Sequence, residues 1–219
     1  MWLADKLVPS PASTNGIAET VSGMFFLFFV YASAPLYARF LAPVASGNQE
    51  LQGRLSNVLA SMPSTRPAFL YDHDDQNANT VGLLAYHSQV YLTTGLMKHI
   101  SDEGLKGILA HEETHVRERH ILMTFCYSCS FTMLAQLFHS NATLALGFLL
   151  YLTLSRHFEY RADAGGAKLV GKATMLAGLH DLHTMYPSKK SQRWFVFAMA
   201  YPTLPMRIKA LETGRRPLF

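Results

Sequence analysis

Apolar residues in this sequence gather into three runs, separated by segments of mixed polarity. The first run covers residues 21–41 and contains no charged residue before Arg39. A helix rises about 1.5 Å per residue, so about 20 residues cross a bilayer, and the run predicts a transmembrane helix at 20–42. A cleaved signal peptide is the alternative. It is disfavoured because the preceding segment is nearly neutral and the run is long for the apolar part of a leader.

Two further uncharged runs, residues 121–138 and 142–154, follow later in the chain. The second is short enough to be a buried core helix instead of a membrane span. The tip between them, residues 139–141, has no Lys or Arg, whereas basic residues flank the pair on both outer sides: Arg117, Arg119, Arg156 and Arg161. Basic flanks tend to stay in the cytoplasm, so we expect a helical hairpin that dips into or crosses a membrane from the cytoplasmic side.

The remaining segments have the mixed polarity of a soluble domain. Apolar residues at helical spacing predict a helix over 49–62. Short β-rich segments predict a strand at 68–71 and a strand pair at 81–86 and 89–92, in a small antiparallel sheet. Ser101 is followed by two acidic residues and is a favourable N-cap, so a helix is expected to start at residue 102.

Composition narrows the class of protein. Charged residues make up 16% of the 219 residues, well below the about 25% of soluble domains. The net charge of +4 is small, and no nucleic-acid-binding motif accompanies it. Two Cys residues exclude a disulfide framework. We therefore expect a folded protein in contact with a lipid bilayer and with no nucleic-acid partner.

One motif carries chemistry: His111-Glu112-Glu113-Thr114-His115. Two histidines four residues apart point to one side of a helix, and this spacing brings two imidazole nitrogens to one Zn²⁺. The glutamate after the first histidine is then placed to take a proton from water and pass it to the leaving amine. Short motifs also arise by chance, so a solvated His/Glu helix face is the alternative.

A catalytic zinc needs a third protein ligand and an open position. Glu159 and Asp163 lie four residues apart, on one face of a predicted helix. Glu159 as the ligand leaves Asp163 to orient a ligating histidine through its second ring nitrogen. The alternative is that both carboxylates form surface ion pairs with Arg156 and Arg161.

The joint pattern resembles the HtpX-type membrane zinc metallopeptidases, relatives of the prenyl-protein (CAAX) proteases. The resemblance runs in order from about residue 77 to the C-terminus. It rests on Asn77-Ala78, Gly95-Leu96, Asp102-Glu103, residues 111–115, residues 155–157 with Glu159, and residues 162–165, 167–171 and 202–211.

This resemblance implies a mainly α (α+β) fold: a zincin-like catalytic domain with a small antiparallel sheet, an N-terminal membrane helix, and a membrane hairpin between the helices that carry the zinc ligands. The expected division is an N-terminal segment (1–19), a transmembrane helix (20–42), the first catalytic part (43–120), the hairpin (121–155) and the second catalytic part (156–219).

The resemblance implies one zinc ion per chain, held by His111, His115 and Glu159, with Glu112 as general base. The implied activity is hydrolysis of peptide bonds at the cytoplasmic face of a bacterial-type inner membrane. Its substrates would be proteins or peptides, chiefly misfolded membrane proteins in quality control. The oligomeric state is left open.

The resemblance also assigns the cleft. It places Asn77, Ala78 and a strand within 81–92 along the substrate, which pairs with that strand through its backbone. Arg207 matches a family arginine at the cleft and serves structure or charge there. Tyr201 stands where the family usually has His, and its hydroxyl would donate the same hydrogen bond to the oxyanion.

Several features depart from the family pattern. Asn79 stands where an aromatic is usual, and one membrane segment precedes the catalytic part where the family usually has two. These departures leave a second function open, a catalytically impaired zincin-fold membrane protein with a signalling or binding role. A third is a soluble secreted peptidase, cleaved near Ala45. His120 is expected at the membrane interface.

Overall fold

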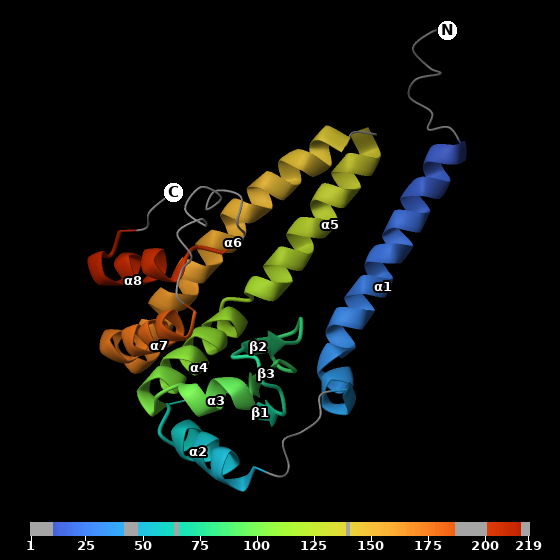
Figure 1. Ribbon diagram of the computed structural model, residues 1–219. Coiled ribbons are helices and arrows are strands. Elements are labelled where there is room, and N and C mark those ends of the chain that lie inside the picture. Colours follow the sequence, from blue (N-terminus) through green and yellow to red (C-terminus); the bar gives the residue numbers. More distant parts are fainter. Residues whose placement is uncertain (1–10, 42–47, 64–65, 139–140, 187–200, 216–219) are drawn as a thin grey trace, which may run out of the picture.

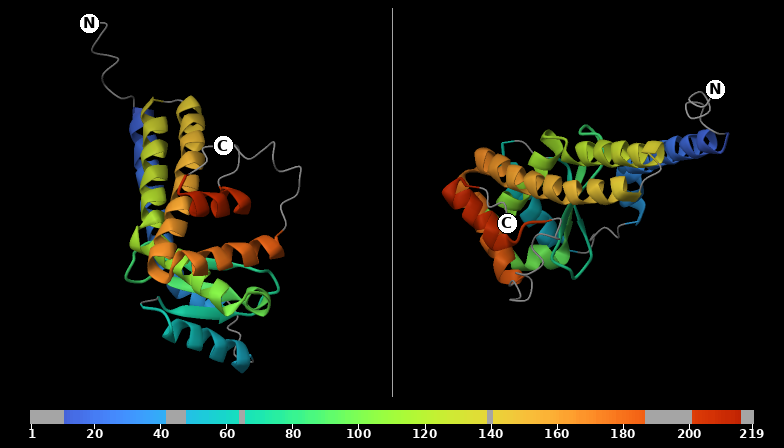
Figure 2. Two further views of the ribbon diagram at one scale, coloured as in Figure 1. Left: turned by 90° about the vertical axis from the view of Figure 1, so that its left-hand side faces the viewer. Right: turned by 90° about the horizontal axis from the view of Figure 1, so that it is seen from above.

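The computed structural model describes residues 11–41, 48–63, 66–138, 141–186 and 201–215. Three long helices extend from one end of a compact body (Figure 1, Figure 2): α1 (Pro11–Leu41), α5 (His120–Phe138) and α6 (Asn141–Val170). The fold is therefore mainly helical, with a membrane-like part and a soluble-like part.

The long helices carry large apolar side chains on their outer faces. Among the described residues, two segments are long and apolar enough to cross a membrane, Ala18–Ala38 and His120–Phe138, and only 6% of each is buried in the protein. The exposed side chains include Phe25, Phe26 and Leu137. Apolar surface of this extent is unfavourable in water, and its length along each helix suits a bilayer.

The body combines a small sheet with shorter helices: α2 (Gln49–Ala60), β1 (Ala68–Tyr71), β2 (Ala78–Val81), β3 (Gln89–Thr93), α3 (Thr94–His99), α4 (Asp102–Arg117), α7 (Lys172–Met185) and α8 (Leu204–Thr213). Its main core lies between the sheet and the apolar faces of α2, α3 and α4, where Leu92, Leu96 and Leu105 are fully buried. The predicted helix over 49–62 and the strand at 68–71 are confirmed.

The sheet is mixed, so the expected antiparallel sheet is wrong for one of its two pairings. The strand order is β1-β3-β2, with β1 parallel and β2 antiparallel to β3. Residue pattern marks which segments are strands, whereas strand direction follows from the connections. The chain leaves β1, runs outward to form β2 at the sheet edge, and returns to place β3 between them.

The expected strand at 81–86 is also wrong, since β2 spans Ala78–Val81 and irregular structure follows it. Gly82 ends the strand with a φ of +123°, and a Cβ there would lie 2.9 Å from the Ser88 Cα. Leu83 is buried without belonging to a strand. Its apolar character reflects burial in a loop, which the sequence pattern does not separate from strand burial.

Close helix packing joins the two parts of the molecule. A Cβ at Gly165 of α6 would lie 2.3 Å from the Thr114 side chain of α4, and a Cβ at Gly178 of α7 would lie 2.9 Å from the Gly104 carbonyl oxygen of α4. The glycines thus allow α6 and α7 to approach the backbone of α4. Because α6 continues unbroken from its apolar half to Val170, it connects the long helices directly to the body.

Candidate active site

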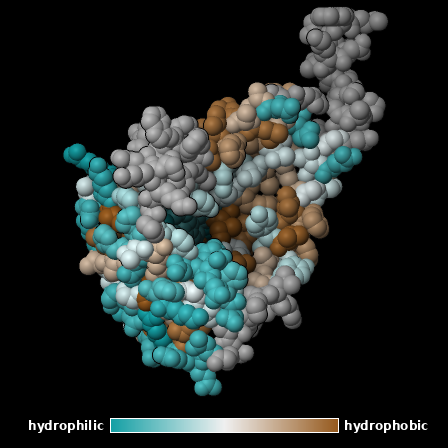
Figure 3. Space-filling model, viewed as in Figure 1, coloured by the Kyte–Doolittle hydropathy of each residue, from teal (hydrophilic) through white to brown (hydrophobic). Residues whose placement is uncertain are grey.

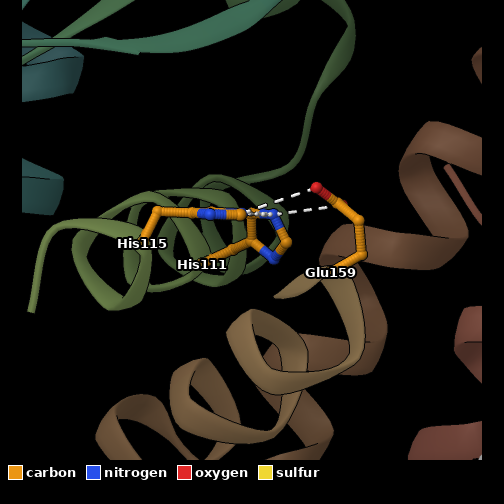
Figure 4. Close-up of side chains that lie close together, drawn as sticks. All are labelled: His111, His115 and Glu159. Carbon is orange, nitrogen blue, oxygen red and sulfur yellow. Dashed lines mark hydrogen bonds and ion pairs between the residues drawn. The ribbon is translucent and has the colours of Figure 1, made fainter. Parts of the chain in front are cut away.

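Helix α4 carries the predicted motif at the centre of the body. Ser101 caps its N-terminus as expected, and its hydroxyl accepts a hydrogen bond from the Gly104 amide at 2.9 Å. His111 and His115 follow one helical turn apart and direct their rings toward α6 (Figure 4). The alternative of a solvated helix face is wrong, since the side chains of His111 and His115 are only 10% and 15% exposed.

Glu159 of α6 completes a compact group of donor atoms with the two histidines (Figure 4). The ligand atoms of His111, His115 and Glu159 all lie within 4.8 Å of one another. The two Nε2 atoms are 3.0 Å apart, and each lies 3.6 Å from a Glu159 carboxylate oxygen. Two imidazoles and one carboxylate around an open cleft are a donor set that fits a catalytic zinc ion.

Burial keeps His115 in the form that binds metal. Burial, together with the neighbouring His111 and His120, lowers the pKa of His115 to about 2. The imidazole is therefore neutral at physiological pH, and a lone pair is available for a cation.

Asp163 and Arg207 support His111 from behind. Asp163 Oδ1 lies 2.9 Å from His111 Nδ1, and the Arg207 guanidinium donates two hydrogen bonds to the same carboxylate, at 2.6 and 2.8 Å. Burial acts to raise the pKa of Asp163, but Arg207 and His111 outweigh it and hold the pKa below its usual range. An ionised Asp163 accepts a hydrogen bond from the Nδ1–H group of His111. The Nε2 lone pair of His111 then faces the other ligands.

Glu159 does not form the surface ion pairs considered as an alternative. It is buried at 7% exposure, and Arg207 Nη1 lies 3.0 Å from its Oε2 atom. Arg161 instead pairs with Glu118 at 2.6 Å. Arg207 thus contacts both carboxylates that α6 directs toward the site.

Glu112 is held by a residue that the sequence did not single out. The Thr80 hydroxyl on β2 donates a hydrogen bond to Glu112 Oε2 at 2.5 Å. Burial raises the pKa of Glu112, which makes its carboxylate a stronger proton acceptor. A threonine in a short strand is common on packing grounds alone, so no sequence signal marked this contact.

His120 lies inside the site, next to His115, at the start of α5 and of the candidate membrane span His120–Phe138. Its position at the membrane interface stays a prediction. His120 is 2% exposed, its Nδ1 lies 3.0 Å from His115 Nδ1, and its ring stacks on Phe158. Arg119 has a φ of 57°, a left-handed conformation that ends α4 and starts α5 at His120. This turn places the His120 ring beside His115.

The two central residues of the motif have structural contacts. Glu113 is buried, and its carboxylate lies 2.7 Å from Arg117 Nε and 3.4 Å from Arg66 Nε. Arg66 also donates a hydrogen bond to the Ala85 carbonyl at 2.6 Å, which ties the loop after β2 to α4. Thr114 is buried against Gly165 of α6. These residues brace the helix without facing the cleft.

The donor group opens into a cleft of about 820 Å³ with mixed polar and apolar walls, called the polar cleft because the charged side chains of the site line it. Its walls include the predicted residues Asn77, Ala78, Tyr201 and Arg207, together with Thr80 and Glu112. The structure therefore brings every predicted site residue to one place, except that Asp163 lies behind the ligands. The strand that lines the cleft is β2 (Ala78–Val81), which overlaps the expected range 81–92 only at its last residue.

Comparison with known proteins decides the family. The sequence profile described as Peptidase family M48 matches residues 45–215. The chain belongs to peptidase family M48. This family assignment agrees with the predicted resemblance and with the intact His-His-Glu group of this M48 chain.

Individual relatives of this M48 chain are distant. It is 28% identical to proteins named Protease HtpX from Escherichia coli O1:K1 and from Shigella boydii serotype 18, across 66% of this chain and 66% of each relative. The chain thus spans just under two thirds of the length of these curated relatives. A crystal structure of Ste24p from S. mikatae has the same fold, with a TM-score of 0.57 and 21% identity, over 86% of this chain and 56% of the other.

Proposed function

We propose that this M48 protein is a membrane-bound zinc endopeptidase. The observation that carries the proposal is the convergence of four side chains from two helices. His111, His115 and Glu159 form one donor group, and Glu112 faces the same polar cleft. One zinc ion per chain is proposed to bind to the three ligands.

A zinc ion held there would polarise the carbonyl of a substrate and make water acidic enough to supply hydroxide at neutral pH. The residues of the chain perform the remaining steps. Glu112 accepts the proton of the attacking water and delivers it to the leaving amine. Tyr201, in the wall of the cleft, is proposed to donate its hydroxyl hydrogen to the oxyanion.

Strand β2 is the proposed substrate-binding edge. It pairs with β3 on one side, and its residues Ala78, Asn79 and Thr80 line the polar cleft. An extended peptide that adds to such an edge is held by backbone hydrogen bonds, with little dependence on sequence. This binding mode suits unfolded protein substrates, and we propose misfolded membrane proteins as their main source.

The proposed location is a bacterial-type inner membrane, with the body in the cytoplasm. Arg117 and Arg119 directly precede α5, and Arg156 and Arg161 follow the apolar half of α6 within the same helix. Basic residues at these positions favour a cytoplasmic body. The proposed units are then the N-terminal segment 1–19, the transmembrane helix 20–42, the hairpin 121–155 and a catalytic domain from 43–120 and 156–219.

The test compares Glu112→Gln with the wild type. The purified protein is incubated with an unfolded membrane protein in detergent, and zinc content is measured on the same samples. Loss of the base is expected to lower turnover at least about 100-fold while zinc stays at one ion per chain. Glu103→Gln is the matched control, because Glu103 lies on the same helix and faces Lys106 and Thr174 outside the cleft.

Undiminished cleavage by a zinc-loaded Glu112→Gln protein would contradict the assignment of the base. Zinc binding without any cleavage by the wild type would instead favour the non-catalytic function, to which Tyr201 and Asn79 point. In that case Tyr201→His is the informative variant, because gain of cleavage would identify the missing group.

A further inference from the structure

A second cavity meets the polar cleft at the candidate metal site. It has a volume of about 580 Å³ and lies between the long helices α1, α5 and α6, and it is called the apolar cavity below. Four residues line both spaces: His115, Ile121, Glu159 and Tyr201. Two of the three candidate ligands, His115 and Glu159, thus lie between the two spaces. The polar cleft lies on the side of the soluble-like body, and the apolar cavity lies among the membrane-like helices.

Apolar side chains form most of the wall of the apolar cavity. Helix α1 contributes Met24, Leu27 and Tyr31, and α5 and α6 contribute Phe125 and Phe158. Figure 3 shows the corresponding change on the surface, where the hydrophilic body gives way to hydrophobic surface in the hollow beside the long helices. A volume of this size is within the range of ligand-binding pockets, about 300–1,000 Å³.

One face of α5 adds hydroxyl groups to this wall. Thr124, Ser128 and Thr132 are spaced by four residues and all line the apolar cavity. In a bilayer, backbone groups that are not in a helix need hydrogen-bond partners from the protein. The Thr132 hydroxyl donates to the Ser128 carbonyl of its own helix at 2.9 Å, so Thr124 and Ser128 are the hydroxyls that can supply such partners to an extended peptide. A lipid acyl chain has no polar group to use them.

We propose that the apolar cavity is a substrate subsite that takes an extended apolar peptide segment on one side of the scissile bond. The other side of the bond continues along β2 in the polar cleft. The enzyme would therefore cut directly beside an apolar stretch of a membrane protein. The occupant is assigned as substrate because the cavity ends on His115 and Glu159. This inference rests on the proposed endopeptidase function.

The test uses three synthetic peptides with the same central sequence. One is polar throughout, and the other two carry an apolar block either before or after the scissile bond. For the wild type in detergent, kcat/KM is expected to be at least about tenfold higher for one of the block peptides than for the polar peptide. The readout is the kcat/KM of the better block peptide divided by the kcat/KM of the polar peptide. A variant that only loses overall activity leaves this ratio unchanged.

Gly23→Leu is the first cavity-filling variant. Gly23 lines the apolar cavity, and a Cβ added there meets no atom within 4 Å. Leucine at this position should occupy the cavity and bring the ratio close to one. Gly16→Leu is the matched control on the same helix, since Gly16 also has open space but lies outside the cavity lining, and its ratio should equal that of the wild type.

Ser128→Leu and Ser130→Leu form a second matched pair on α5. Both serines are exposed, but only Ser128 lines the apolar cavity. Ser128→Leu should lower the ratio, and Ser130→Leu should leave it unchanged. A wild-type ratio near one, as expected if lipid or another helix fills the cavity, would overturn the inference. So would equal ratios for the members of each pair.

Binding to the Glu112→Gln protein separates this inference from the proposed function. The dissociation constants of fluorescently labelled polar and block peptides are measured for Glu112→Gln alone and combined with Gly23→Leu. Tighter binding of a block peptide that Gly23→Leu abolishes supports the subsite even if the wild type cleaves nothing, in which case only the proposed function fails. Equal binding of all peptides overturns the subsite.

Discussion

At the scale of single residues, the site depends on partners that orient its reactive groups. Glu112 contacts the hydroxyl of Thr80, His111 contacts Asp163, and His115 contacts His120. Each partner comes from a different element: β2, α6 and the start of α5. The reactive groups are thus held by three separate parts of the chain, and each contact gives a distinct mutational test.

Thr80→Val should lower kcat about tenfold with little change in KM or zinc content. Valine keeps the shape of the side chain and removes the hydrogen bond to a charged carboxylate, and such a bond is worth about 1.5–3 kcal/mol. Thr80→Ser restores a hydroxyl and should recover most of the rate. If Val and Ser variants have equal rates, Thr80 acts only in packing. Steady-state kinetics with zinc analysis makes the comparison.

Asp163→Asn should weaken zinc binding about 10–100-fold, because Asp163 orients the His111 ring and raises its basicity. Competition with a fluorescent zinc chelator measures the affinity. Asp74→Asn is the matched control, since Asp74 is exposed and does not line the polar cleft. Unchanged zinc affinity in Asp163→Asn would assign Asp163 to the ion pair with Arg207 alone.

At the scale of elements, the contact between α4 and α6 sets the position of the third ligand. The donor atoms meet because Gly165 lets α6 approach Thr114 closely, about one and a half turns beyond Glu159. Most of these elements were predicted from the sequence: α2, β1, β3, the start of α4, and the apolar segments of α1, α5 and α6. The sequence pattern missed β2 and the parallel pairing of β1 with β3, because both depend on connections between segments.

Gly165→Ala should lower the free energy of unfolding by about 1–3 kcal/mol, since the added methyl overpacks the contact with Thr114. Gly53→Ala is the matched control on α2, where a Cβ meets nothing within 4 Å. It should raise stability by about 0.5–1 kcal/mol through the helix propensity of alanine. Chemical denaturation of the detergent-solubilised protein compares them, and equal effects would contradict close packing at Gly165.

At the scale of the whole molecule, α6 joins the membrane-like and soluble-like parts without a break. Its apolar half packs along α5, where the Tyr127 hydroxyl donates to the Gly147 carbonyl at 2.8 Å, and its second half carries Glu159 and Asp163. A rigid helix of this kind fixes the depth of the metal site relative to the bilayer. The site is therefore expected at the cytoplasmic surface, beside the apolar cavity.

Cysteine labelling in intact cells tests this orientation. In a background where Cys126 and Cys129 are replaced by Ser, Asn141→Cys at the far end of the hairpin should react with a membrane-impermeant maleimide added outside. Ser56→Cys, on the exposed face of α2 in the body, should react only after the membrane is permeabilised. The reverse pattern would place the body outside the cytoplasm.

The sequence by itself determined which side chains can bind a metal and which segments are apolar enough to contact lipid. His111 and His115 share a helix face because of the helical period, and the apolar runs are long enough to interact with lipid whatever the rest of the chain does. Tertiary structure decided what depends on contacts between distant segments: the hydrogen bond of Thr80 to Glu112, the burial of His120, the mixed sheet, and the meeting of two cavities at the metal site. Local periodicity constrains side chains within one element, whereas these features need the packing of several.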